Sequence, residues 1–174
     1  MAILPIIKAP DPILKKRCAP VERVDDEIRR LMDDMLETMY AAPGVGLAAP
    51  QVGVTRRVIV IDTARHDEEP NPLFIANPTI VEASEEIALR EEGCLSFPDQ
   101  YEEVERPERV RVRYLDHENE IREIEADGLL AICIQHEMDH LDGVLMVDHL
   151  SGLKRSMILR RMAKLKKAGA PVGA

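Results

Sequence analysis

The chain has 174 residues, which is enough for one domain with a sizeable core and too few for two. Its hydrophobic content of 45% and charged content of 32% are ordinary for a soluble globular protein and exclude intrinsic disorder. The formal net charge of -9 disfavours non-specific binding to nucleic acid over most of the surface. Because no apolar run could serve as a signal-peptide core or cross a bilayer, we expect a cytoplasmic protein without a membrane partner.

The first half of the chain predicts one helix followed by short strands. Residues 24–40 place apolar side chains at helical spacing, with Asp25 as the N-terminal cap and Pro43 and Gly44 ending the run. Short strands are expected next, at residues 57–62, 73–76, 79–81 and 86–90.

The second half predicts a hairpin and two helices. Residues 109–114 alternate arginines with Val110, Val112 and Tyr114, the pattern of a half-buried strand, and a turn at 116–119 leads into a partner strand at 120–126. A helix over 127–143 is apolar on nearly every side before its histidines, which predicts burial. An amphipathic helix over 153–167 follows, rich in lysine and arginine.

This order of elements predicts an α+β fold with mainly antiparallel strands, an N-terminal helix and a C-terminal amphipathic helix. We expect residues 1–168 to form a single domain and residues 169–174, rich in Gly, Ala and Pro, to be a flexible tail.

The segment His136-Glu137-Met138-Asp139-His140 carries the clearest chemical signal. Two histidines four residues apart lie one above the other on a helix and can hold one cation between them. Glu137 lies beside that cation without having to ligate it, so it could take a proton from a bound water whose pKa the metal lowers to about 7. The sequence therefore predicts a catalytic metal site on the buried helix.

Spacing alone leaves the third ligand open. The extended zinc-protease pattern would place a histidine where this chain has Met146, and His149 lies further on, past the expected helix end. Cys133 is about 10 Å along the helix from His140, too far to join both histidines on one ion, and reads as a wall residue or plain core. Cys94, next to Gly93 in a polar segment, is the better candidate.

Three segments together resemble the three motifs of bacterial peptide deformylases. They are Gly44-Val45-Gly46-Leu47-Ala48-Ala49-Pro50-Gln51, Glu92-Gly93-Cys94-Leu95-Ser96 and Gln135-His136-Glu137-Met138-Asp139-His140. They occur in the order and spacing of that family, and the similarity extends over residues 3–167. The resemblance implies a fold in which antiparallel strands enclose a central active-site helix.

The resemblance also implies a role for each matched residue. Cys94, His136 and His140 would hold one divalent metal ion, commonly Fe(II) in the family, although zinc, nickel or cobalt can occupy the site. Glu137 would act as general base and then general acid. The side-chain amide of Gln51 and the backbone N–H of Leu95 would stabilise the oxyanion.

The implied substrate is the N-formylmethionine of nascent peptides. Its contacts would involve these residues: Gly44, Val45, Gly46, Glu92, Gly93, Leu129, Ile132 and Cys133. Position 101 is Tyr, where many relatives carry an arginine thought to touch the peptide backbone. How the protein would bind substrate residues beyond the methionine is therefore left open. Arg106 and Glu92 resemble a structural ion pair near the site.

The C-terminal helix suggests a further partner. From His149 onward the chain has no acidic residue and seven basic ones: Lys154, Arg155, Arg160, Arg161, Lys164, Lys166 and Lys167. A run of cations without acids is suited to phosphate contacts, so ribosomal RNA is a candidate partner, and a solvated helix face is the alternative.

Two other functions compete with deformylation. A zinc endopeptidase of the H-E-x-x-H type would use a downstream third ligand such as His149. A non-enzymatic ribosome-associated module would enclose a structural metal in four protein ligands.

Overall fold

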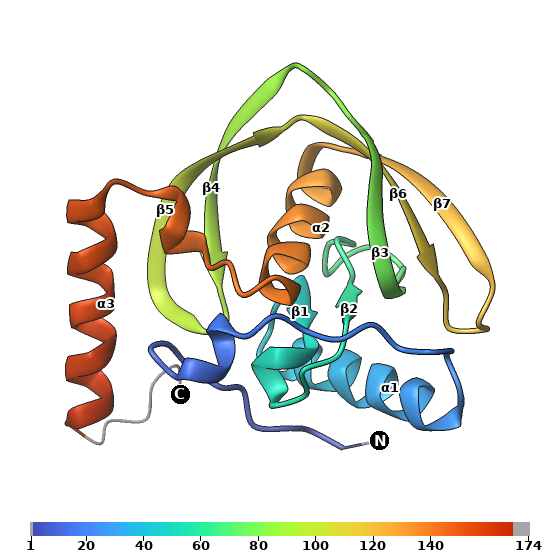
Figure 1. The fold of residues 1–174 in the computed structure, drawn as a ribbon, viewed down its shortest axis with the longest axis horizontal. Coiled ribbons are helices and arrows are strands. Elements are labelled where there is room, and N and C mark those ends of the chain that lie inside the picture. The colour runs from blue at the N-terminus through green and yellow to red at the C-terminus, as the bar shows by residue number, and fades with distance from the viewer. Residues whose placement is uncertain (1, 169–174) are drawn as a thin grey trace.

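The computed structural model describes residues 2–168 and contains two separate antiparallel sheets and three α-helices (Figure 1). The elements follow the chain in this order: η1 (Pro12–Lys15), α1 (Asp26–Ala41), β1 (Gly46–Ala48), η2 (Ala49–Val52), β2 (Val58–Ile61), β3 (Leu73–Ala83), β4 (Ile87–Cys94), β5 (Phe97–Pro107), β6 (Arg109–Leu115), β7 (Ile121–Asp127), α2 (Gly128–Leu141), η3 (Met146–His149) and α3 (Gly152–Lys167).

The two sheets enclose helix α2. One sheet has the strand order β1-β2-β3-β6-β7, and the other pairs β4 with β5. Figure 1 shows β3 and β6 of the first sheet and β4 and β5 of the second bending together over α2, which runs between them. The predicted α+β fold, with antiparallel strands around a central helix, is confirmed.

The N-terminal helix α1 begins and faces the core as predicted. The side chain of Asp25 accepts a hydrogen bond from the Ile28 amide at 3.0 Å and so caps the helix. Met32, Met35 and Met39 are fully buried on one face, where they pack against β2. In a chain with few aromatic residues, methionines fill this part of the core.

Helix α2 is largely buried, because the turns of the helix before His136 are almost entirely apolar. Ile134 and Leu141 are fully buried in the cluster that α2 shares with the large sheet. The helix ends at Leu141, two residues before the predicted stop at Gly143, which has a φ of 74°. A Cβ at this position would lie 2.3 Å from the carbonyl oxygen of Lys15, so only glycine allows the chain to pass so close to η1.

Three strand predictions were incomplete. The pieces expected at 73–76 and 79–81 form the single strand β3, which is interrupted by register shifts rather than broken. Asn77, with a φ of 51°, lies at the first shift, where its side chain bonds both the amide and the carbonyl of Val21. Strands β1 and β5 were not predicted, since β1 is only three residues long and β5 is dominated by charged and polar residues.

The C-terminal helix α3 packs on the small sheet through a narrow apolar stripe. Ile158 and Met162 are buried beside Phe97 and Val104 of β5, and Ser151 caps the helix through the Lys154 amide. The tail predicted at 169–174 lies outside the described residues. Within residues 2–168, no helix combines the length and the apolar character needed to cross a membrane.

Candidate metal centre and substrate pocket

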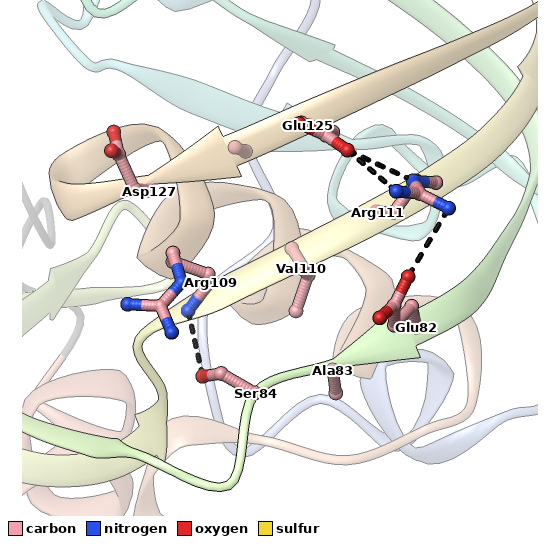
Figure 2. Close-up of a pocket in the computed structure, with 9 residues that line it drawn as sticks. Glu82, Ala83, Ser84, Arg109, Val110, Arg111, Glu125 and Asp127 are labelled. Atoms are coloured by element: carbon pink, nitrogen blue, oxygen red, sulfur yellow. Dashed lines mark hydrogen bonds and ion pairs between the residues drawn. The ribbon is translucent and has the colours of Figure 1, made fainter.

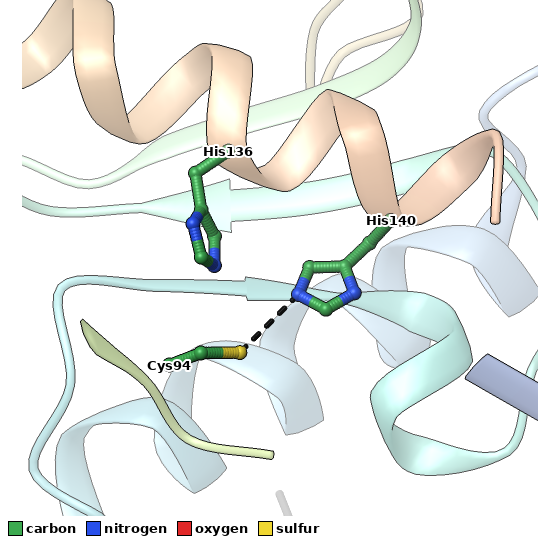
Figure 3. A group of neighbouring side chains, drawn as sticks. All are labelled: Cys94, His136 and His140. Carbon is green, nitrogen blue, oxygen red and sulfur yellow. Dashed lines mark hydrogen bonds between the residues drawn. The ribbon is translucent and has the colours of Figure 1, made fainter. Parts of the chain in front are cut away.

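One cysteine and two histidines from distant parts of the chain converge beside α2. Cys94 ends β4, whereas His136 and His140 lie one turn apart on α2 (Figure 3). One ligand atom from each residue lies within 4.8 Å of the others, and the Cys94 Sγ is 3.4 Å from His140 Nε2. This is the only such group of three or more potential ligands found in residues 2–168.

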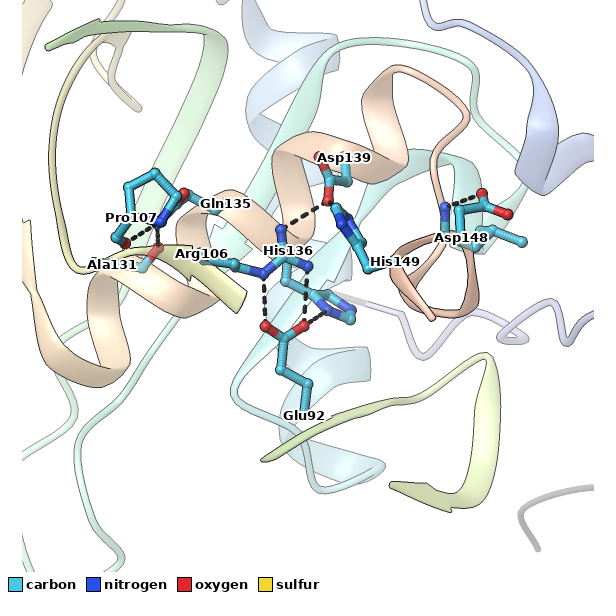
Figure 4. A network of polar contacts seen from close by, with 10 residues as sticks. Glu92, Arg106, Pro107, Ala131, Gln135, His136, Asp139, Asp148 and His149 are labelled. Atoms are coloured by element: carbon cyan, nitrogen blue, oxygen red, sulfur yellow. Dashed lines mark hydrogen bonds and ion pairs between the residues drawn. The ribbon is translucent and has the colours of Figure 1, made fainter. Parts of the chain in front are cut away.

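Glu92 sets the orientation and tautomer of His136. Its carboxylate accepts from His136 Nδ1 at 2.9 Å, and because a carboxylate can only accept, the proton is on Nδ1 and Nε2 keeps its lone pair for a metal (Figure 4). Arg106 donates two further hydrogen bonds to Glu92, at 2.6 and 3.0 Å. Burial alone would raise the pKa of Glu92, but the hydrogen bonds from His136 and Arg106 lower it to about 2.

The electrostatic environment of this group fits a cation. Burial disfavours a charged His136, yet Glu137, Cys94 and Glu92 around it raise its pKa well above the ordinary value. The site thus attracts positive charge. Burial lowers the pKa of His140 well below its usual range, which keeps that ring in the neutral form that ligates metals.

Glu137 lies at the site as an unpartnered acid. Its Oε1 is buried and has no hydrogen-bond partner among residues 2–168. Burial raises the pKa of Glu137 to about 7, a value suited to taking and returning a proton near neutral pH. Gly46 of β1 packs directly against the Glu137 side chain, since a Cβ at position 46 would lie 2.6 Å from Glu137 Oε2.

Gln51 in η2 points its amide at the same centre. Its Oε1 accepts from the Ala48 amide at 2.9 Å, which fixes the direction of the side chain. Its Nε2 donates to Ser96 Oγ at 3.0 Å and to Cys94 Sγ at 3.6 Å. A buried amide N–H is therefore held next to the Cys94 sulfur, where it can stabilise charge developing on a bound carbonyl oxygen.

A pocket of about 730 Å³ opens onto this centre. All the predicted substrate residues line it: Gly44, Val45, Gly46, Glu92, Gly93, Leu129, Ile132 and Cys133. Leu95 and Tyr101 also line it, so the position that departs from the family pattern faces the pocket. Burial raises the pKa of the Cys133 thiol to about 12, and this residue lies outside the group of three potential ligands.

Sequence reasoning missed several residues around the site. Ser96 receives the amide of Gln51, and Asp139 accepts from Arg106 at 2.8 Å. Their positions beside Leu95 and His140 in the matched motifs were the only available signals. The N-terminal segment also lines the pocket, through Ile3, Leu4, Ile6 and Lys8, and no pattern in the sequence indicated this.

His149 does not serve as the third ligand that an endopeptidase would require. Its Nε2 bonds to Asp139 Oδ2 at 2.8 Å, whereas Cys94 is the third member of the group that could hold a metal ion. The endopeptidase alternative is therefore not favoured. The four-ligand structural site also finds no support, because the group found in the described part of the chain has three members.

A second hollow, of about 370 Å³, lies on the large sheet and is lined by residues of β3, β6 and β7 (Figure 2). Its arginines are already paired: Arg111 with Glu82 at 3.1 Å and with Glu125 at 2.6 Å, and Arg109 with Glu86 at 3.0 Å. It contains no titratable group comparable to Glu137, so the chemistry is concentrated beside α2.

Comparisons with known proteins agree with this geometry. The family model described as polypeptide deformylase matches residues 3–156. A peptide deformylase from Phenylobacterium zucineum (strain HLK1) is 59% identical over 168 residues, which cover 97% of this chain and 99% of that relative. One from Mesorhizobium japonicum (strain LMG 29417 / CECT 9101 / MAFF 303099) is 56% identical over 171 residues, covering 98% of this chain and 97% of that relative.

Solved structures show the same fold. The crystal structure of peptide deformylase from Ehrlichia chaffeensis has a TM-score of 0.92 at 40% identity and covers 97% of this chain and 99% of that chain. A peptide deformylase from Legionella pneumophila gives a TM-score of 0.89 at 46% identity and covers 98% and 99%. On the strength of its sequence over nearly its whole length and of its fold, this chain belongs to the peptide deformylase family.

Proposed function

We propose that this chain, a hydrolase that removes N-terminal formyl groups, does so with a metal-activated water whose proton passes through Glu137. The observation that carries this mechanism is the convergence of Cys94, His136 and His140 beside the buried, unpartnered Glu137 Oε1. The whole of residues 1–168 would act as one catalytic domain.

The donor set fits a divalent cation. Cys94 would supply a thiolate and the two histidines would supply neutral imidazoles, a set that suits Fe(II), Zn, Co or Ni. We take Fe(II) as the native ion, in line with the resemblance of the motifs. When bound, such an ion supplies Lewis acidity that lowers the pKa of a water to about 7 and polarises a carbonyl.

Glu137 would move the proton. As a carboxylate it takes a proton from the attacking water, and as a carboxylic acid it returns a proton to the departing amine nitrogen. The C–N bond of the formamide breaks, and formate and the free amine leave. A pKa of about 7, raised by burial, lets one group serve in both steps.

Gln51 and Leu95 would stabilise the negative charge on the formyl oxygen. The Gln51 amide is held in place through Ala48 and Ser96, so it needs no reorganisation when charge develops. Leu95 follows Cys94 directly in the chain and lines the same pocket, so its backbone N–H lies close to the group of potential metal ligands.

The pocket would select methionine. Val45, Leu129, Ile132 and Cys133 form apolar walls suited to an unbranched thioether side chain. Gly44, Gly46 and Gly93 also line the pocket, where their backbone would lie close to the backbone of the peptide substrate. The space beside each glycine is filled by a side chain of this chain, in turn Leu95, Glu137 and Tyr101. Glu92 orients His136 at the end of the pocket. The natural substrates are N-formyl nascent peptides, and we propose the cytoplasm as the site of the reaction.

The test is purification with Fe(II) under anaerobic conditions, followed by assays on formyl-Met and acetyl-Met peptides. Formate release that matches the appearance of new amines, from the formyl peptide alone, is the expected result. A fully metal-loaded protein that releases no formate would overturn the proposal. Cleavage inside an unformylated peptide would instead support the endopeptidase alternative.

We also propose that the basic face of α3 contacts ribosomal RNA. Lys164, Lys166 and Lys167 in its last turns are exposed and have no ion-pair partner among residues 2–168. Deleting α3 would remove Ile158 and Met162 and expose Phe97 and Val104, which pack against them, so charge reversal is the cleaner perturbation.

A triple variant with glutamates at these three lysines should weaken salt-dependent ribosome binding, because fewer cations neutralise phosphates. The matched control reverses three exposed cations elsewhere: Lys16, Arg17 and Arg23. Equal ribosome binding by the two variants would rule out α3 as the contact surface.

A further inference from the structure

A line of five polar side chains connects a metal ligand to the segment that precedes α3. This polar network consists of His136, Glu92, Arg106, Asp139 and His149 (Figure 4). His136 Nδ1 donates to Glu92 at 2.9 Å, and Arg106 donates twice to Glu92 and once, at 2.8 Å, to Asp139 Oδ2. The same Asp139 oxygen accepts from His149 Nε2 at 2.8 Å.

The inner part of the polar network is buried and its outer end is not. The side chains of Glu92 and Arg106 are each 4% exposed, whereas those of Asp139 and His149 are 27% and 32% exposed. Buried ion pairs depend on good geometry, because each charge has lost its hydration. The orientation of Arg106 therefore depends on both carboxylates it contacts, and His149 helps to hold the outer one.

The backbone that carries His149 is fixed on both sides. Met146 and Val147 of η3 are buried, and Asp148 accepts hydrogen bonds from Lys15 at 2.7 Å, from the Leu145 amide at 2.9 Å and from Arg155 at 2.9 Å. The His149 ring is thus presented to Asp139 by a rigid segment and does not depend on a mobile loop.

We propose that His149 is a positioning residue for the metal ligand His136, acting through Asp139, Arg106 and Glu92. This proposal rests on the proposed function only in assigning His136 to the metal. Removing the His149 donor leaves Asp139 held by Arg106 alone, so both side chains gain freedom. Glu92 then holds the His136 ring less firmly in the orientation that presents Nε2 to the metal.

The test compares five proteins loaded with Co(II): the wild type, His149→Ala, His149→Gln, His149→Met and His117→Ala. The last is a matched control, because His117 also bonds a carboxylate, Asp33, at 3.0 Å, and its side chain is 28% exposed, but it lies outside the polar network. The readouts are the visible absorption of Co(II), its release to a chelator, and kcat and KM on a formyl-Met peptide.

His149→Ala should change the Co(II) absorption and release the metal roughly 3- to 10-fold faster, with kcat falling by a similar factor and KM unchanged. Loss of a group that touches a ligand directly costs roughly 10- to 100-fold, and His149 lies three hydrogen bonds further out. His149→Gln, which can still donate to Asp139, should restore most of the loss. His149→Met, similar in volume but without a donor, should behave like the alanine variant.

Wild-type absorption and metal release in His149→Ala and His149→Met would overturn the proposal. So would an equal change in His117→Ala, because the effect would then be general destabilisation. If the wild type binds Co(II) but hydrolyses no formyl peptide, the proposed function fails, while metal release and absorption still decide the role of His149.

Discussion

Replacing Gly46 by alanine should disable Glu137 without touching a metal ligand. The added Cβ would lie 2.6 Å from Glu137 Oε2 and 3.1 Å from both its Cγ and its Cδ. Rotating the carboxylate cannot relieve the contact, because Cγ is also too close. To reach ordinary van der Waals contact at 3.4 Å, Oε2 must move by about 0.8 Å and Cγ and Cδ by about 0.3 Å each.

A displacement of about 1 Å in a catalytic group can cost about 100-fold in rate, or about 2.7 kcal/mol. We therefore expect kcat of Gly46→Ala to fall by roughly 100-fold, with a loss of stability of about 1–3 kcal/mol from overpacking. Metal content should stay at the wild-type level, since Cys94, His136 and His140 are not in the way.

The assay is kcat and KM on a formyl-Met peptide, together with metal analysis and thermal unfolding of the same sample. Gly152→Ala is the control, because nothing lies within 4 Å of its added Cβ, and it should keep full kcat. Full turnover of Gly46→Ala with a full complement of metal would refute the assignment of Glu137 as the proton carrier.

Two further predictions concern single carboxylates. Glu137→Gln should keep its metal but lose turnover, checked by metal analysis and formate release. After metal removal, Glu137→Gln should also be more stable than the wild type at pH 8 but not near pH 4. The pKa of Glu137 is about 7 in the folded state and 4.5 in the unfolded state, so its ionisation destabilises the folded wild type only above pH 4.5. Burial tends to raise the pKa of Asp148, but hydrogen bonds from Lys15, the Leu145 amide and Arg155 lower it below the ordinary value of 3.8. The ionised Asp148 therefore stabilises the folded state fully above pH 3.8, and this stabilisation is lost as the pH falls through the folded pKa. Asp148→Asn should therefore lower Tm by roughly 2–5 °C at pH 7 and by much less at pH 2.5, and an equal decrease at both values would contradict the ion-pair explanation.

Elements with local signals could be predicted without the tertiary structure. Asp25 and the apolar face after it predicted α1, and the alternation around Val110 and Val112 predicted β6, because caps and periodicity act within a few residues. The pair His136 and His140 was equally local, since a spacing of four puts both rings on one side of any helix.

The strands and contacts that depend on distant partners required the tertiary structure. Strand β5 carries charged or polar residues at most positions, and its pairing is imposed by β4 across the tight turn after Cys94. The bulge in β3 depends on Asn77 bonding Val21, a contact across 56 residues that no window of sequence contains.

The candidate third metal ligand likewise required the tertiary structure as well as the sequence. Residue chemistry and helix spacing left Cys94 and His149 as candidates and argued against Cys133, and the motif resemblance favoured Cys94. Only the fold brings the end of β4 next to α2, turns His149 toward Asp139 and buries Cys133 as an apolar wall. Ligands separated by about 40 residues are brought together by packing between a sheet and a helix, a long-range effect that helix periodicity cannot encode.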